Sequence, residues 1–165
     1  MRLVAISLTA LLLCSCASYS GRGLKPGEAS LDDVIHTMGA PAMRWQNADG
    51  AMQLAYPRGP LGFDTYMVFV GREGKLQRIE NVLKPRYFSL VRVGMTKDQV
   101  LRILGPSVPA WTGYYKARDE LALEWRYCSD WRAATRFDVL FDGSKGTVRS
   151  TFSRTESCGP GDCPC

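Results

Sequence analysis

Histidine is nearly absent from this 165-residue chain, which contains a single one, His36. His36 falls on the polar side of a short expected helix and has no obvious partner there. Enzyme active sites usually combine a nucleophile, a base and a group that orients the base, and no motif in the sequence assembles such a set. We therefore interpret His36 as a surface residue and expect that the protein is not an enzyme.

The chain also lacks a candidate transmembrane helix at its N-terminus. The apolar run Leu3–Leu13 follows Arg2 and is too short to span a bilayer stably, which is typical of a secretory signal peptide over residues 1–15. A bacterial lipobox needs a small residue before the modified cysteine. Ser15 before Cys16 meets this need, whereas Leu13 before Cys14 does not, so we assign lipidation to Cys16. Ordinary cleavage, with both cysteines incidental, is the alternative.

The residues around the anchor indicate where the mature protein lies. Ala17 after Cys16, rather than Asp, is typical of bacterial lipoproteins sent to the outer membrane, so we expect a lipid-anchored protein facing the periplasm. Residues 16–26 contain glycine, serine and lysine and are predicted to form a short tether. The formal charge of +5 for the whole chain is too weak to indicate a specific lipid site. Nucleic acid is not an expected partner of an exported lipoprotein.

Two stretches carry the start and stop signals of a helix. In the second, Thr96 is placed to cap a helix that begins at Lys97, and Gln99 completes a capping box. Gly105 and Pro106 end this helix. Its apolar residues are predicted to pack on a sheet, while its polar residues Lys97, Asp98 and Arg102 are predicted to face water. The earlier stretch, residues 25–41, repeats this pattern from a cap at Ser30 to Gly39.

Alternating or continuous apolar runs predict strands after each helix. They cover residues 43–46, 52–56, 66–70, 75–82, 121–127, 137–141 and 148–152, and residues 87–91 are predicted as a short extra helix. Gly39 aligns with Gly105 at an offset of 66, and Leu76 aligns with Val148 at 72, which indicates a duplication. We expect units at residues 27–83 and 86–154 that share apolar surface, because each is marginal alone.

The sequence VGMTKDQVLRILGPS, from Val93 to Ser107, resembles the signature of the SmpA/OmlA (BamE-like) family of outer-membrane lipoproteins. The resemblance implies an ααβββ unit with helices on an antiparallel meander. Together with the duplication, this predicts an α+β fold of two such units in tandem, packed together, although the family itself has a single unit. In shape this is similar to the tandem β-lactamase inhibitor protein. The family also implies a protein partner, including the β-barrel assembly machine, and no cofactor. The tail at residues 155–165 has no counterpart in that family.

Cysteines and one tryptophan are the remaining site candidates. Cys128, Cys158, Cys163 and Cys165 are an even number in an oxidising compartment, which favours disulfides over a zinc or copper(I) site. If the last three strands form a meander, Cys128 and the tail lie at the same end of the sheet. A Cys128–Cys158 bond is then permitted, although Cys163 or Cys165 can take its place. We expect no metal.

Tryptophans 45, 111 and 125 fall on strand patterns and are expected in the core, whereas Trp131 lies in a loop between strands. Trp131 and its neighbour Arg132 are therefore candidate partner-binding residues. The leading functional hypothesis is a protein-binding or assembly factor, accessory to outer-membrane β-barrel assembly. A cysteine-based metal or redox lipoprotein and a proteinaceous enzyme inhibitor are the alternatives.

We expect that Cys16→Ala moves the protein from the membrane fraction to the soluble periplasmic fraction, because acyl chains rather than the folded part hold it at the membrane. Cell fractionation measures this change, and Cys14→Ala is the matched control that should stay membrane-bound. An intact mass showing an unmodified mature N-terminus contradicts the assignment.

Overall fold

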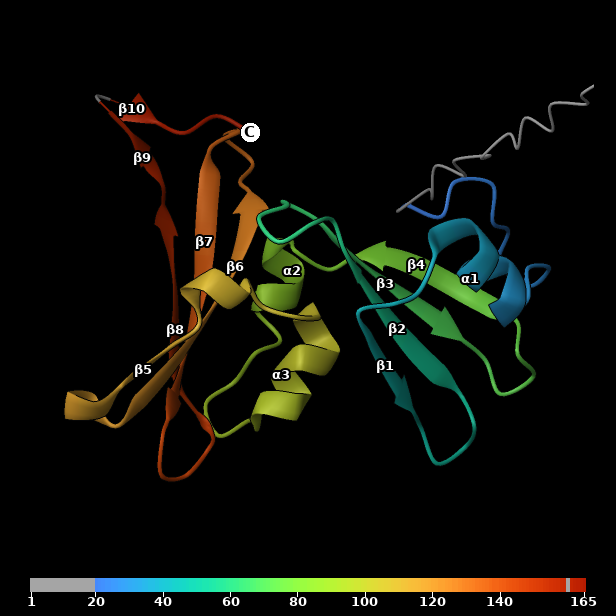
Figure 1. Ribbon diagram of the computed structural model, residues 1–165, viewed down its shortest axis with the longest axis horizontal. Helices are drawn as coiled ribbons and strands as arrows, with labels where there is room; N and C mark the ends of the chain where they lie inside the picture. Colours follow the sequence, from blue (N-terminus) through green and yellow to red (C-terminus); the bar gives the residue numbers. More distant parts are fainter. Residues whose placement is uncertain (1–19, 160) are drawn as a thin grey trace, which may run out of the picture.

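The computed structural model describes residues 20–159 and 161–165, so the predicted signal peptide, Cys16 and the start of the tether lie outside the described residues. Antiparallel strands dominate the described part and form two four-stranded sheets and a small hairpin (Figure 1). Within those same residues, none of the helices has the length and apolar character that spanning a membrane requires.

The first sheet has the order β1-β2-β3-β4 and follows one helix in the chain. The bounds of these elements are α1 (Leu31–Met38), β1 (Met43–Gln46), β2 (Met52–Pro57), β3 (Thr65–Val70) and β4 (Leu76–Asn81). Two further helices precede the second sheet, which has the order β5-β6-β7-β8 and is followed by the tail hairpin. Its elements are α2 (Pro85–Phe88), α3 (Lys97–Leu104), η1 (Pro109–Trp111), β5 (Gly113–Tyr115), η2 (Lys116–Arg118), β6 (Glu120–Cys128), β7 (Ala134–Asp142), β8 (Val148–Thr155), β9 (Ser157–Cys158) and β10 (Gly161–Asp162).

Both long helices have the predicted caps. The Ser30 hydroxyl accepts from the Asp33 backbone N–H at 3.1 Å, and the Thr96 hydroxyl accepts from that of Gln99 at 3.3 Å, with the reciprocal bond present in each case. Gly39 and Gly105 end the helices with φ of 81° and 74°, a region that glycine enters without a Cβ penalty. The predicted capping boxes and helix bounds are therefore confirmed.

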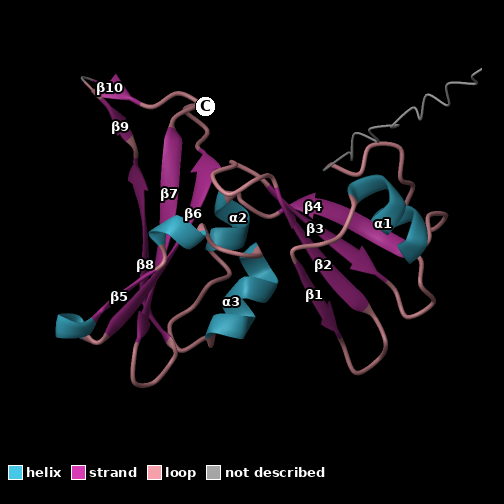
Figure 2. Ribbon diagram, in the orientation of Figure 1, coloured by secondary structure: helices cyan, strands magenta, loops and turns pink. Residues whose placement is uncertain are grey.

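The predicted architecture of two tandem ααβββ units is wrong. Three α-helices occur in residues 20–159 and 161–165, one before the first sheet and two before the second, and each sheet has four strands (Figure 2). In the first unit, the residue pattern predicted four strands, and only the family resemblance reduced them to three. In the second, β5 is three residues long and too short to show an alternating pattern.

The elements stack as layers, with α3 between the two sheets (Figure 1). On one side, Val100 and Leu104 of α3 join the core of the second sheet, which Phe88 of α2 also enters. On the other, Leu101 packs on a smaller cluster that includes Trp45 and Met67 of the first sheet. The expectation that the units share apolar surface is confirmed, because α3 supplies side chains to both.

Asp98 and Arg102 of α3 also contact the first sheet, so their assignment to a purely solvent-exposed face is wrong, whereas Lys97 is exposed as predicted. The Trp45 indole N–H donates to the Asp98 carboxylate at 3.0 Å. The Arg102 carbonyl accepts a hydrogen bond from the Gln53 amide. The Arg102 guanidinium donates to the Asn47 side chain at 3.3 Å. Hydrogen bonds and apolar contacts therefore hold the two units together along one side of α3.

A short segment before each long helix pairs with the start of the last strand of its sheet. The backbone of Gly27 donates to Leu76, and the backbone of Gly94 donates to Val148, at 2.7 and 2.9 Å. Leu24 packs against the core of the first sheet, although it falls within the predicted tether of residues 16–26. The folded part therefore begins before residue 27.

We expect Leu104→Ala to lower the free energy of unfolding by about 2 to 5 kcal/mol, since this side chain is fully buried in the second core and truncation leaves a cavity. Lys97→Ala, at an exposed position on the same helix, should change it by less than about 0.5 kcal/mol. Denaturant unfolding measures both values. Equal losses in the two variants contradict the packing of α3.

Candidate functional site

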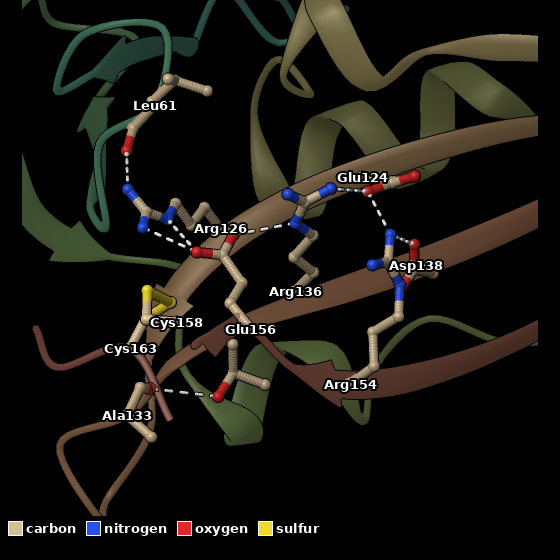
Figure 3. A network of polar contacts seen from close by, with 11 residues as sticks. Leu61, Glu124, Arg126, Ala133, Arg136, Asp138, Arg154, Glu156, Cys158 and Cys163 are labelled. Carbon is tan, nitrogen blue, oxygen red and sulfur yellow. Dashed lines mark hydrogen bonds and ion pairs between the residues drawn. A yellow bond between two sulfur atoms is a disulfide. The ribbon is translucent and has the colours of Figure 1, made fainter. Parts of the chain in front are cut away.

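The outer face of the second sheet is opposite the helices and carries charged side chains. Along β6, Leu123, Trp125 and Tyr127 point to the helices, so Glu124 and Arg126 point outward. The same alternation in β7 and β8 places further charged residues on the outer face. The network that results comprises Glu124, Arg126, Arg136, Asp138, Arg154 and Glu156 (Figure 3).

Each arginine of this network bonds to a carboxylate on a neighbouring segment. Arg154 reaches Glu124 at 2.7 Å and Asp138 at 3.1 Å. Arg136 reaches Glu124 at 3.1 Å and Glu156 at 2.8 Å, and Arg126 reaches Glu156 at 2.7 Å. The three carboxylate side chains are only 3 to 11% exposed, which is tolerable because each is paired.

Burial and pairing act in opposite directions on the pKa values of the carboxyl groups. Burial raises the pKa of Asp138 above its usual value, although Arg154 donates hydrogen bonds to it. Burial also acts to raise the pKa of Glu156, but hydrogen bonds from Arg136 and Arg126 outweigh it and hold the pKa below its usual value. Glu156 therefore stays ionised between its two arginines at neutral pH.

Arg126 connects this network to the first unit. Its guanidinium lies 4.3 Å from the centre of the Phe63 ring and donates to the Leu61 carbonyl at 3.3 Å. An apolar cavity of about 350 Å³ lies beside this contact, between the two units. Its lining residues include Pro57, Gly62, Leu83, Pro106, Val108 and Trp125. The loop between β2 and β3 thus forms one wall of the cavity. Arg126 fixes this loop through its contacts with Leu61 and Phe63.

The tail begins at Glu156, and the backbone of this residue bonds both to the start of β7 and to the tail itself. Its N–H donates to the Ala134 carbonyl at 2.8 Å, and its own carbonyl accepts from the Cys163 N–H at 3.1 Å. The Cys163 carbonyl in turn accepts from the Ala134 N–H at 2.6 Å. The tail therefore attaches where β7 begins and β8 ends.

The described residues form two disulfides, Cys128–Cys165 and Cys158–Cys163, with Cα separations of 5.8 and 4.9 Å. All four cysteines form disulfides, as predicted. The Cys128–Cys158 bond is not among them. The reason is the hairpin of β9 and β10, which reverses the chain after Cys158, sets Cys158 against Cys163 and carries Cys165 back to the end of β6. In residues 20–159 and 161–165, no group of three or more His, Cys, Asp or Glu residues is arranged to hold a metal ion.

The turn between β6 and β7 is braced by this tail. Within the turn, the Arg132 N–H donates to the Ser129 carbonyl at 2.9 Å, and the Ala133 N–H donates to the Ser129 hydroxyl at 3.2 Å. The Cys165 N–H donates to the Arg132 carbonyl at 3.1 Å, next to the Cys128–Cys165 disulfide. At the tip of this turn, the Trp131 side chain is 91% exposed. The structure thus places the candidates Trp131 and Arg132 together on a fixed, projecting turn.

The other tryptophans divide between the core and the outer face. Trp45 and Trp125 are buried as predicted, with 8% and 1% exposure. Trp111 lies in η1 rather than on a strand, and its ring stacks on the Arg136 guanidinium at 3.5 Å, so its assignment to a core strand is wrong. His36 is exposed in the last turn of α1.

Sequence reasoning missed the charged network. Its signal was the alternation of acidic and basic residues at the polar positions of three predicted strands, as in Glu124 and Arg126, or Arg136 and Asp138. Which residues meet follows from register, in which Arg126 faces Arg136, and Arg136 faces Arg154. That register became available only with the folded structure.

No protein-family model and no curated protein matches this sequence. Among solved structures, the chain is similar to an extracellular protein containing an SCP domain from Bacillus anthracis str. Ames, with 11% identity, 96% of this chain covered and a TM-score of 0.29. The chain spans about half, 55%, of the length of that protein's chain. A similarity at this level assigns neither a fold family nor a function.

We expect the Cys128–Cys165 bond to stabilise the fold more than the Cys158–Cys163 bond does. The first closes a separation of 37 residues and the second one of 5, so loop entropy predicts losses of about 4 and about 2 kcal/mol when each pair is replaced by serine. Denaturant unfolding compares the two double variants. Non-reducing peptide mapping checks the pairing, and a free thiol at Cys128 in protein kept under oxidising conditions contradicts it.

Proposed function

We propose that the protein is an outer-membrane-anchored lipoprotein that acts in the periplasm by binding another protein and not by catalysis. The observation that carries this proposal is the exposure of Trp131 on a braced turn. An aromatic side chain of this size is a strong anchor when a partner buries it, and tryptophan and arginine are enriched among such anchors. Arg132, beside it, is also exposed.

The bracing of the turn supports a binding role on energetic grounds. Association costs free energy when flexible loops and side chains become ordered, so a loop that is already fixed binds more tightly. Here hydrogen bonds within the turn, the Cys165 backbone and the Cys128–Cys165 disulfide fix the loop before any partner arrives. The cysteine tail therefore has a role in this proposal, since it holds the turn that presents Trp131.

The proposed compartment rests on the sequence and agrees with the disulfides. The lipobox at Leu13–Cys16 directs export and lipidation, and disulfides persist in oxidising compartments such as the bacterial periplasm. The resemblance of Val93–Ser107 to the SmpA/OmlA signature supports a partner in the machinery that assembles outer-membrane β-barrels. The protein partner is therefore sought in the outer membrane.

The proposal is tested by placing a photoreactive benzoylphenylalanine at position 131 of the full-length protein in living cells. Irradiation should yield a specific cross-linked adduct with an outer-membrane protein, which mass spectrometry identifies. The control places benzoylphenylalanine at position 115 instead. The native Tyr115 is 47% exposed and lies at the other end of the sheet. The absence of an adduct at position 131, or the same adduct from both positions, contradicts the proposal.

With a partner identified, Trp131→Ala should weaken its binding by about 2 kcal/mol or more, roughly thirtyfold, because a desolvated anchor is lost. The free energy of unfolding should change by less than about 0.5 kcal/mol, since the side chain contributes little to the folded core. Tyr115→Ala should leave binding unchanged. Binding measurements and denaturant unfolding on the same samples separate the two effects.

A further inference from the structure

Strand β8 presents the longest edge of either sheet that no segment within residues 20–159 and 161–165 covers. The edge strands β1 and β5 have four and three residues, and the start of β4 is bonded to the segment before α1. In β8, all residues from Arg149 to Thr155 are exposed. Exposed edges present unpaired N–H and C=O groups that can bind another strand. The edge is therefore a candidate for β-strand pairing with another chain.

The fold limits this edge at both ends. At its start, Val148 exchanges backbone hydrogen bonds with Gly94 and Met95, at 2.9 and 2.8 Å, so the neighbourhood of Arg149 is occupied. At its other end, β8 stops at Thr155, and the chain continues into the hairpin of β9 and β10. The free part of the edge is thus limited to residues 150–155.

The direction of the backbone groups follows from the antiparallel ladder. Because Glu156 donates to β7, the residues two and four before it, Arg154 and Phe152, also bond to β7. The intervening residues Thr151, Ser153 and Thr155 therefore direct their N–H and C=O groups away from the sheet. A strand added at this edge would bond to these three residues.

We propose that this edge binds the same edge of a second copy of the protein, antiparallel and with a two-fold axis at Ser153. Thr151 then pairs with Thr155 of the second copy, Ser153 with its equivalent, and Thr155 with Thr151. All three are hydrogen-bonded pairs, because each residue directs its backbone groups outward. The two four-stranded sheets become one continuous sheet of eight strands.

The side chains favour this register over its neighbours. On the outer face, Phe152 lies opposite Arg154 of the second copy, and Ser150 lies opposite Glu156, so no like charges meet. Centring the pair on Phe152 brings Thr155 against Arg149, where Gly94 and Met95 already lie. Centring it on Arg154 places two arginines opposite each other, which is destabilising. Of these three registers, the edge is therefore complementary to itself in the one centred on Ser153.

Single cysteine substitutions in the full-length lipidated chain, in cell membranes, test the register. Ser153→Cys should form a disulfide-linked dimer in at least about tenfold higher yield than Thr151→Cys or Thr155→Cys alone, because hydrogen-bonded partners lie roughly 5.5 Å apart, within disulfide range. Chains carrying Thr151→Cys and Thr155→Cys, produced together, should cross-link to each other. Peptide mapping verifies that the two native disulfides remain.

A second measurement tests the backbone contact itself. Ser153→Pro removes an outward N–H that β7 does not use, so the fold should be retained while the dimer is lost in light scattering of the detergent-solubilised protein. Ser153→Ala keeps this N–H and should remain a dimer. A wild-type monomer, cross-linking at similar yields at all three positions, or cross-linking of Ser153→Cys to a different protein overturns the proposal.

Discussion

Helix α3 makes contacts on two sides, and the arrangement of the whole protein depends on this. Val100 and Leu104 fill the core of the second sheet, while Leu101, Asp98 and Arg102 contact the first sheet. A unit of this size buries a smaller fraction of its surface than a larger domain does and is marginal by itself. By serving both sheets, one short helix gives each unit additional buried surface and fixes how they are joined.

On the other face of the second sheet, the charged network likewise holds separate segments of the chain together. Buried carboxylates are costly unless they are paired, and here every carboxylate of the network bonds to at least one arginine on a neighbouring segment. Glu156 belongs both to this network and to the backbone junction from which the tail begins. The position of the tail, and through it the Trp131 turn, is thus linked to the packing of charges on the sheet.

The proposed contacts with other molecules use two different surfaces. Trp131 projects from one end of the second sheet, whereas the free part of β8 runs along its edge. The first presents a side chain and the second presents backbone groups, so substitutions at one should leave the other intact. The proposed membrane anchor suits both, because it would confine copies of the protein and its partners to the same surface.

Local signals in the sequence determined much of the secondary structure. A capping box involves two residues that are three positions apart in the sequence. Thr96 and Gln99 therefore indicate the start of α3 without any tertiary contact. The alternation in β6 and the loop position of Trp131 are equally local. These features were predictable because each depends on a few neighbouring residues.

Contacts between distant residues were decided only by the tertiary structure. The sequence predicted four cysteines in disulfides, but the reversal of the chain after Cys158 determined which of them meet. Asp98 and Arg102 have the composition of a solvent-exposed helix face, and only the packing of the first sheet against α3 gives them partners. The count of helices and strands in each unit depended in the same way on pairing between segments, which a local pattern does not encode. Helix caps and strand alternation are properties of a few adjacent residues, whereas register, disulfide pairing and the docking of the units are properties of the folded whole.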